Sequence, residues 1–137
     1  MALFVGRYEH SLDAKGRVIL PAKFRSAFED GGFLSQHNEG CLALWTIDEF
    51  ADKMLTMRAS AAAGSKEERN LVRVWAAGSH EVEIDRNGRM PIPPHLREFA
   101  NLDGDVLING AIERIELWSP AAWEERVRPS ERQLTDA

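Results

Sequence analysis

The sequence has few of the residues from which disulfides, metal sites and membrane spans are built. Its one cysteine, Cys41, cannot form an internal disulfide, and its histidines, which are His10, His37, His80 and His95, lack the spacing of zinc ligands. No apolar run approaches the roughly 20 residues that cross a bilayer. The opening residues lack the basic flank and long apolar core of a signal peptide. These absences predict a cytoplasmic protein without a structural metal or a membrane partner.

Patterns that bind nucleotides or form catalytic groups are also missing. Neither the phosphate-binding pattern G-x-x-x-x-G-K-S/T nor the dinucleotide-binding pattern G-x-G-x-x-G occurs. No Ser-His-Asp or Cys-His pairing stands out either. An enzyme would have to depend on exposed aspartates and histidines alone, so we predict no catalytic residue, no metal site, no cofactor and no small-molecule ligand.

The formal net charge of −5 argues at first sight against a nucleic-acid partner, but the charge is unevenly distributed. Residues 1–25 contain five basic and two acidic side chains, which gives +3 and leaves −8 for the other 112 residues. A basic face on an acidic body can still bind phosphate groups, although charge alone is better explained by a solvated surface. The length of 137 residues fits one domain, or two small ones that share a core.

The clearest positive feature is an internal repeat. The stretch DAKGRVILPAKFR, residues 13–25, returns in looser form as DRNGRMPIPPHLR, residues 85–97. With a shift of 72, residues 6–25 align with 78–97, and seven of the twenty aligned positions are identical. The identical pairs are Gly6/Gly78, Glu9/Glu81, Asp13/Asp85, Gly16/Gly88, Arg17/Arg89, Pro21/Pro93 and Arg25/Arg97. This agreement indicates an internal duplication.

Each copy predicts the same succession of local structures. An extended segment leads to a four-residue turn, Asp13–Gly16 or Asp85–Gly88, whose Asp and Gly suit a type I turn. A short strand follows, which a proline ends before a short helical segment, and two further strands complete the copy. In the second copy Pro91 has no backbone N–H, so its strand should lie at a sheet edge or be locally unpaired.

Longer helices are predicted after the last strand of each copy. Thr46, Ser65 and Ser119 are candidate N-caps, and Trp45 and Trp118 occupy hydrophobic-staple positions. The final ten residues are polar and should be loose. One apolar stripe marks the first helix and consists of Ile47, Phe50, Met54, Met57 and Ala61.

The alternation of side chains along a strand decides what each turn presents. Val18 and Leu20 share the face expected in the core, whereas Arg17 has the opposite parity and should point outward beside Lys15. Gly16 lets the backbone approach a ligand closely. The second copy repeats this pattern with Met90, Ile92 and Arg89.

Asp13 and Asp85 each stand four residues before an arginine and allow four roles. An aspartate at such a place can be a general base or a metal ligand. More often it hydrogen-bonds the backbone of the turn. It can also hold the nearby arginine in one orientation.

The paired stretches resemble the two SpoVT-AbrB repeats of the MraZ family. The resemblance covers nearly the whole chain and includes YEHSLDAKGR, EERNLVRVWAAGSHEVEID and LREFANLDGDVLINGAIERIELWSPAAWEE. It implies a β-rich α+β fold, in which two AbrB-like swapped-hairpin halves form one pseudo-dimeric β-barrel core with flanking helices. The implied organisation is a first SpoVT-AbrB domain at 7–54, connecting helices at 55–78, a second domain at 79–122, and a helix end and tail at 123–137.

The resemblance also implies a function. MraZ proteins are bacterial transcriptional regulators that bind short tandem direct repeats in the promoter of the division and cell-wall gene cluster, and they assemble as homo-oligomeric rings. A nucleoid-associated protein is therefore expected. AbrB-like folds also serve as antitoxin-type protein-interaction modules, so that alternative stays open.

The family's D-x-x-x-R motif maps onto Asp13 to Arg17 and Asp85 to Arg89. Asn87 stands where the first copy has Lys15, although Arg86 can compensate for the lost charge, and Pro91 interrupts the second strand. The first turn is therefore the stronger candidate for DNA contact. Residues expected to contact double-stranded DNA are Lys15, Arg17, Arg7, Lys23, Arg25, Arg86 and Arg89. Residues expected to form and orient the turns are Asp13, Gly16, Asp85 and Gly88.

Overall fold

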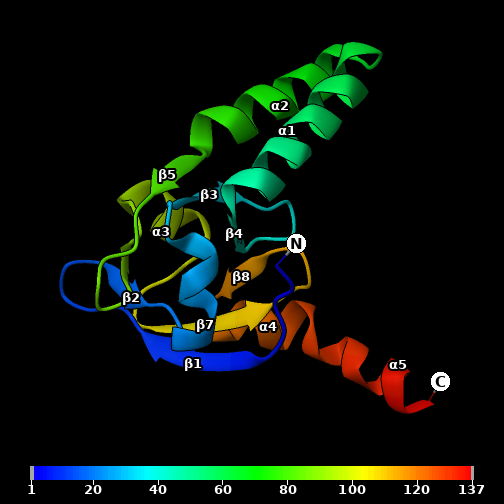
Figure 1. Cartoon of the computed structure of the whole chain (residues 1–137). Coiled ribbons are helices and arrows are strands. Elements are labelled where there is room, and N and C mark those ends of the chain that lie inside the picture. The colour runs from blue at the N-terminus through cyan, green and yellow to red at the C-terminus, as the bar shows by residue number, and fades with distance from the viewer. Residues whose placement is uncertain (1, 137) are drawn as a thin grey trace.

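A computed structural model describes residues 2–136, and in it both copies contribute strands to common sheets (Figure 1). The strands are β1 (Arg7–Ser11), β2 (Arg17–Ile19), β3 (Gly32–Gln36), β4 (Leu42–Trp45), β5 (His80–Val82), β6 (Arg89–Pro91), β7 (Asp105–Gly110) and β8 (Ile115–Trp118). The α-helices are α1 (Ile47–Ala62), α2 (Lys66–Gly78), α3 (Pro94–Phe99), α4 (Pro120–Arg126) and α5 (Glu131–Asp136), and the 3₁₀ helices are η1 (Ala22–Phe28) and η2 (Arg128–Ser130).

Strand pairing crosses from one copy to the other. The six-stranded antiparallel sheet has the order β1-β7-β8-β4-β3-β5, so β1 of the first copy pairs with β7 of the second. In the same way β5 of the second copy pairs with β3 of the first, and β2 pairs with β6 in a separate two-stranded ribbon. Neither copy has a complete sheet without the other, and the two therefore form one folding unit.

The expected closed β-barrel is not formed. Within residues 2–136, β1 and β5 are the two outer strands of an open sheet, and the β2–β6 ribbon pairs only with itself. The ribbon is too short to bridge the edges, because each of its strands has three residues and Pro91 has no N–H to donate. The fold is therefore α+β with two antiparallel sheets, and Pro91 lies on an edge strand as predicted.

The main core lies between the six-stranded sheet, the β2–β6 ribbon and the short helical segments η1 and α3. Val18, Leu20, Met90 and Ile92 are at most 2% exposed, which confirms the parity prediction for both copies. They pack in one cluster with aromatic and aliphatic side chains from the sheet and from η1. Burial of each such side chain stabilises the fold by roughly 1.5–3 kcal/mol.

The other face of the sheet is covered by helices in two places. Trp45 packs beneath α1 and α2, and Trp118 packs beneath α4, where its ring meets Trp123 edge to face at 5.7 Å. The predicted caps are present: the hydroxyls of Thr46 and Ser119 accept N–H groups of the first helical turn, and Ser65 forms a complete capping box. The two tryptophans are therefore structural, as their staple positions predicted.

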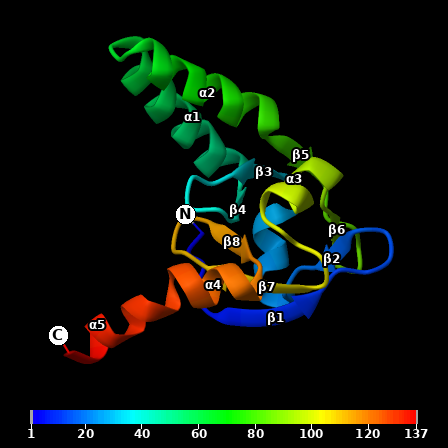
Figure 2. The ribbon, with the colours of Figure 1, turned by 180° about the vertical axis from the view of Figure 1, so that it is seen from behind.

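Helices α1 and α2 form a helical hairpin, here called the arm, that projects from the body (Figures 1 and 2). Its apolar stripe is covered only in part. Phe50 and Ala61 are buried, whereas Met54 is 46% exposed on α1 and Leu71 is 67% exposed on α2. None of the helices in the described part of the chain is long and apolar enough to cross a membrane. In a single chain the arm thus leaves apolar surface in contact with water.

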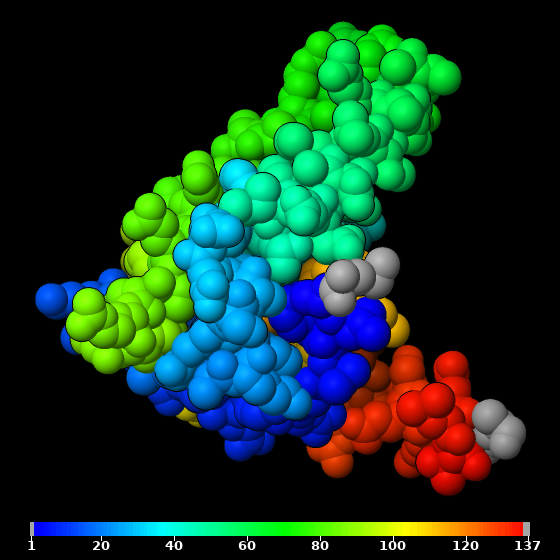
Figure 3. Space-filling view, in the orientation of Figure 1, coloured from blue at the N-terminus to red at the C-terminus, as the bar shows by residue number. Residues whose placement is uncertain are grey.

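The C-terminal residues differ from the prediction of a loose tail. Residues 128–136 are helical and extend away from the body, as the space-filling view shows (Figure 3). Arg128 forms an ion pair with Glu124 at 2.8 Å, one helical turn earlier, and Glu131 accepts a hydrogen bond from Arg7 at 3.3 Å. Such pairs support a helix end that composition alone describes only as polar.

Candidate nucleic-acid interface

The two Asp–Arg turns lie side by side at one end of the molecule, away from the arm and the C-terminal helices (Figures 1 and 2). The β2–β6 ribbon brings them together, because its register sets Arg17 opposite Pro91 and Ile19 opposite Arg89. The turns that are 72 residues apart in sequence therefore form a single surface. We call this surface the paired turns, residues 13–17 and 85–89.

The first turn is held by its aspartate. The N–H of Gly16 donates to the carbonyl of Asp13 at 3.0 Å, which closes the predicted four-residue turn. One carboxylate oxygen of Asp13 accepts the N–H groups of Lys15 and Arg17, both at 2.9 Å, and the other accepts Nε of Arg17 at 2.8 Å. The aspartate therefore both forms the turn and orients the arginine.

The second turn reproduces these contacts. Asp85 accepts the N–H groups of Asn87 and Arg89 at 2.9 Å each, and it accepts Nε of Arg89 at 2.7 Å. Gly88 closes the turn through its N–H to the carbonyl of Asp85 at 2.9 Å. The same hydrogen bonds in both copies show that the repeated residues specify the turn.

The aspartates are ionised and the arginines keep free donors. The backbone N–H of the following arginine, followed by its side chain and the second backbone N–H, holds the pKa of Asp13 and of Asp85 below the ordinary value. Of the guanidinium nitrogens of Arg17 and Arg89, only Nε donates a hydrogen bond within residues 2–136. The terminal guanidinium nitrogens, which form the fork that recognises phosphate or a guanine edge, have no acceptor there.

The other residues predicted to contact DNA do not all lie at the paired turns. Arg86 is exposed on the second turn, and Arg25 reaches the second turn from η1. Arg7 instead pairs with Glu131 and lies 5.2 Å from the centroid of the Trp123 ring, at the start of β1. Lys23 lies over aromatic rings, 5.3 Å from the centroid of Tyr8. The structure thus gathers Lys15, Arg17, Arg25, Arg86 and Arg89, and gives Arg7 and Lys23 other partners.

One basic residue of this surface is missing from the sequence prediction. Arg97 reaches from α3 to Gly16 in the first turn, as Arg25 reaches Gly88 in the second. The identical pair Arg25/Arg97 in the repeat alignment was the available signal. With Arg97 included, six basic and two acidic side chains lie at the paired turns, a local net charge of +4 on a chain of net charge −5.

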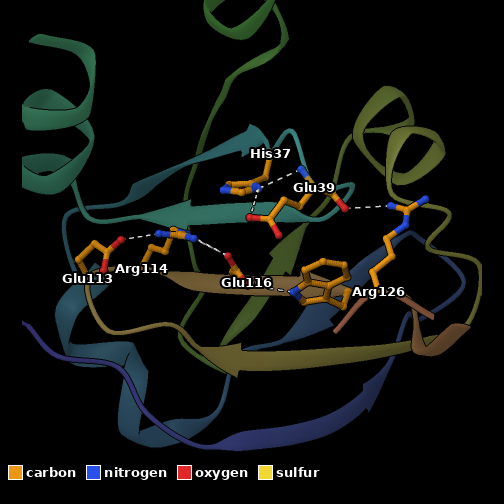
Figure 4. A network of polar contacts seen from close by, with 7 residues as sticks. His37, Glu39, Glu113, Arg114, Glu116 and Arg126 are labelled. Carbon is orange, nitrogen blue, oxygen red and sulfur yellow. Dashed lines mark hydrogen bonds and ion pairs between the residues drawn. The ribbon is translucent and has the colours of Figure 1, made fainter. Parts of the chain in front are cut away.

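A second polar cluster, which the sequence did not reveal, lies on the outer face of the sheet (Figure 4). Arg114 pairs with Glu113 and with Glu116 at 2.7 Å, and Glu116 also accepts the indole N–H of Trp118 at 3.0 Å. Burial, with the nearby Arg114, lowers the pKa of His37 in the adjacent loop. The side-chain hydrogen bonds and ion pairs of Arg114 and Glu116 stay within residues 113–118, and Arg126 of α4 donates to the carbonyl of Glu39 in the β3–β4 loop at 2.9 Å, so we read the cluster as structural.

The chain matches one family model twice. The family is described as "MraZ protein, putative antitoxin-like", and the matches cover residues 3–74 and 75–137.

In the part of the chain that the structure describes, no group of three or more histidine, cysteine, aspartate or glutamate side chains is arranged to hold a metal ion.

Curated relatives agree with this match. A protein of Acetivibrio thermocellus named "Transcriptional regulator MraZ" is 41% identical over 122 residues, which is 89% of this chain and 85% of the relative. Proteins of the same name from Kocuria rhizophila and Halothermothrix orenii are 39% identical over 134 residues and 42% identical over 123 residues. These two alignments cover 98% and 88% of this chain, and 93% and 84% of the relatives. The chain belongs to the MraZ family, whose named members are transcriptional regulators and not enzymes, and it contains two MraZ domains.

Proposed function

We propose that this protein is a sequence-specific, DNA-binding transcriptional regulator that acts on the bacterial nucleoid. Its target would be short tandem direct repeats in the promoter of the division and cell-wall gene cluster. The observation that supports this most strongly is the pair of turns, which present oriented arginines on one surface. The name of the relatives, transcriptional regulator, points to the same class of protein.

The chemistry divides between affinity and specificity. Lys15 and Arg86, exposed on the turns, suit phosphate oxygens, which give affinity without sequence information. Arg17 and Arg89 are held by a carboxylate at Nε and can direct their terminal nitrogens to O6 and N7 of a guanine in the major groove. The halves at 7–54 and 79–122 would thus each supply one arginine that contacts a base. The first half would bind more strongly because Lys15 stands beside Gly16, where the second half has Asn87 beside Gly88.

The remaining basic residues have a smaller proposed part. Arg7 and Lys23 are proposed as peripheral phosphate contacts, and each would first have to leave its present partner. Arg25 is also near enough to the second turn to contribute charge. None of the three is as free as Lys15 or Arg86.

One surface of this size makes few contacts, so a single chain should bind DNA weakly. We propose that copies associate in a ring, so that several paired turns meet successive repeats and gain affinity through effective concentration. Support comes from a partly apolar cleft of about 370 Å³ between the arm and the body. Its apolar lining includes Trp45, Met57, Leu71, Val74, Trp75 and Phe99, and a second copy is the occupant we propose.

The function is tested by measuring the Kd for a promoter fragment with tandem repeats at several salt concentrations. The logarithm of affinity should fall with the logarithm of salt at a slope of about −0.9 per phosphate contact. A fragment of the same length with the repeats scrambled is the control. A flat salt response, or equal affinity for both fragments, would contradict sequence-specific binding.

An antitoxin-type protein-interaction module is the second candidate, favoured by the description of the matching family model as antitoxin-like. Such a module would bind and inhibit an enzyme through its own surface. Affinity purification of the intact protein from its host, with and without nuclease, separates the two. Recovery of one enzyme in stoichiometric amount and no promoter DNA would favour this candidate.

A further inference from the structure

Each of the paired turns is covered by an arginine from the other copy of the repeat. The guanidinium of Arg97, from the second copy, lies against Gly16, so that a Cβ on this glycine would come 2.7 Å from Cζ of Arg97. The guanidinium of Arg25, from the first copy, lies against Gly88, with a corresponding distance of 2.7 Å to its Nη2. Real Cβ atoms essentially never approach another atom so closely. We call these the cross-repeat contacts.

Backbone conformation favours glycine at both turns, and the cross-repeat contacts add a close neighbour that a side chain there would have to push aside. Gly16 and Gly88 have φ angles of +74° and +82°, which favour glycine. They are buried although the residues before them in each turn are exposed, because the arginine of the other copy covers them. A side chain at either position would displace that arginine as well as strain the backbone.

Backbone hydrogen bonds also join each turn to the other copy of the repeat. The carbonyl of Gly16 accepts the N–H of Ile92 at 3.0 Å, and the carbonyl of Gly88 accepts the N–H of Leu20 at 2.8 Å. Arg25 is itself fixed, since its Nε donates to the carbonyl of Leu20 at 2.8 Å. Each turn is therefore held by its own aspartate on one side and by the other copy on the opposite side.

We propose that Arg25 and Arg97 are positioning residues that fix the DNA-contacting turn of the opposite copy, so that Arg17 and Arg89 meet DNA as one rigid pair. Arg97 acts on Arg17 through Gly16, and Arg25 acts on Arg89 through Gly88. The effect is steric and depends on the flat guanidinium group, not on the positive charge alone. This inference depends on the proposed DNA-binding function, and it adds that the two half-surfaces are coupled across the repeat.

The first test is a double-mutant cycle on binding of the intact protein to repeat DNA. As a single substitution, Arg97→Ala should weaken DNA binding about tenfold, which lies within the range of coupling energies between contacting residues. In a protein that already carries Arg17→Ala, the same substitution should weaken binding almost no further. Arg97→Ala should add its full effect to Arg89→Ala. Arg25→Ala should weaken binding almost no further in a protein that carries Arg89→Ala, and should add its full effect to Arg17→Ala. Losses that add fully in every combination, or that couple within one copy, would overturn the proposal.

Two further variants separate positioning from direct charge. Arg97→Lys keeps the charge but loses the planar group, so it should bind as weakly as Arg97→Ala; full rescue would mean that Arg97 contacts phosphate and does not position the turn. Arg126→Ala is the matched control, because Arg126 makes the same kind of contact with Gly40 (φ +97°) in the β3–β4 loop and donates to the carbonyl of Glu39. It should leave DNA binding unchanged.

Amide hydrogen exchange tests the cross-repeat contacts without DNA. Arg97→Ala should speed exchange of the Ile92 N–H, whose acceptor is Gly16, and spare that of Leu20, whereas Arg25→Ala should do the reverse. Equal exchange in the variants and the wild type would overturn the proposal even if DNA binding fell. If the wild type fails to distinguish repeat DNA from scrambled DNA, the proposed function is wrong, and the exchange result still decides whether these arginines hold the turns.

Discussion

Asp13 and Arg17 are joined twice, through the backbone N–H of the arginine at 2.9 Å and through its Nε at 2.8 Å. The carboxylate thus fixes both the start of the arginine side chain and its guanidinium plane, and it leaves the two terminal nitrogens free. Asp85 and Arg89 repeat this arrangement. Of the roles that the sequence allowed for these aspartates, the structure shows two, turn formation and orientation of the arginine.

Arg17→Ala should weaken binding to repeat DNA by about tenfold or more, because an oriented arginine at a base edge is worth about 1–3 kcal/mol. The side chain lies outside the core, so the free energy of unfolding should change by less than about 0.5 kcal/mol. Fluorescence anisotropy and urea denaturation measure the two quantities. Arg89→Ala is the comparison and should cost less, because Asn87 stands beside Gly88 where the first turn has Lys15 beside Gly16. A larger loss for Arg89→Ala would reverse our ranking of the copies.

Asp13→Ala should weaken DNA binding even though it removes a negative charge from the surface that faces DNA. Loss of the turn hydrogen bonds and of the oriented arginine outweighs the gain in net charge. Asp13→Asn should bind better than Asp13→Ala, since the amide oxygen can still accept the N–H groups of Lys15 and Arg17. Tighter binding of Asp13→Ala than of wild type would show that the carboxylate acts only as an unfavourable charge.

Acid should reveal the stabilising role of these carboxylates. Hydrogen bonds lower the pKa of Asp13 and Asp85 in the folded chain, so their contribution to stability is complete above the ordinary pKa near 3.8 and is lost as pH falls through the lower, folded value. The difference in unfolding free energy between wild type and the double variant Asp13→Asn, Asp85→Asn should therefore be constant from pH 7 to about pH 5 and shrink below about pH 4. A difference that grows on acidification would contradict the lowered pKa.

His37 should make stability fall on mild acidification. Burial lowers its pKa, so between the folded value and the ordinary value of 6.5 the unfolded chain binds more protons. Stability should therefore decrease as pH falls through 6.5 toward the folded pKa, and His37→Gln should reduce this dependence. Urea denaturation between pH 5 and pH 8 measures it, with the exposed His80→Gln as control. If the pH dependence of the unfolding free energy is unchanged in His37→Gln, another titrating group causes it.

Leu71→Glu should reduce the size of the assembly measured by light scattering and leave the unfolding of the single chain nearly unchanged. Leu71 lines the cleft beside the arm and is 67% exposed, so a charge there disrupts association without opening the core. Leu55→Glu is the matched control, because Leu55 is 62% exposed on the same arm but does not line the cleft. Equal effects of both variants would argue against this cleft as the contact between copies.

Features that depend on residues close together in the sequence could be predicted, whereas features that depend on distant residues could not. The turns at Asp13 and Asp85, the helix caps and the burial of Val18 and Met90 followed from residues within a few positions, and all are present. The closed barrel was wrong, because closure depends on which strands reach each other and not on the pattern of any one strand. The helical conformation of residues 128–136 was not predicted, because their composition shows only that the segment is polar.

The sequence by itself determined the repeat, the two Asp–Arg turns and the outward parity of Arg17 and Arg89, because these depend on local backbone chemistry and on the alternation of a strand. Only the tertiary structure decided that the two turns form one surface, through the register of β2 with β6. It alone placed Arg97 on Gly16 and Arg25 on Gly88, since contacts between residues about 60 to 80 positions apart depend on how the copies interleave. The same interleaving leaves the arm outside the shared core, with an apolar face that the single chain does not cover.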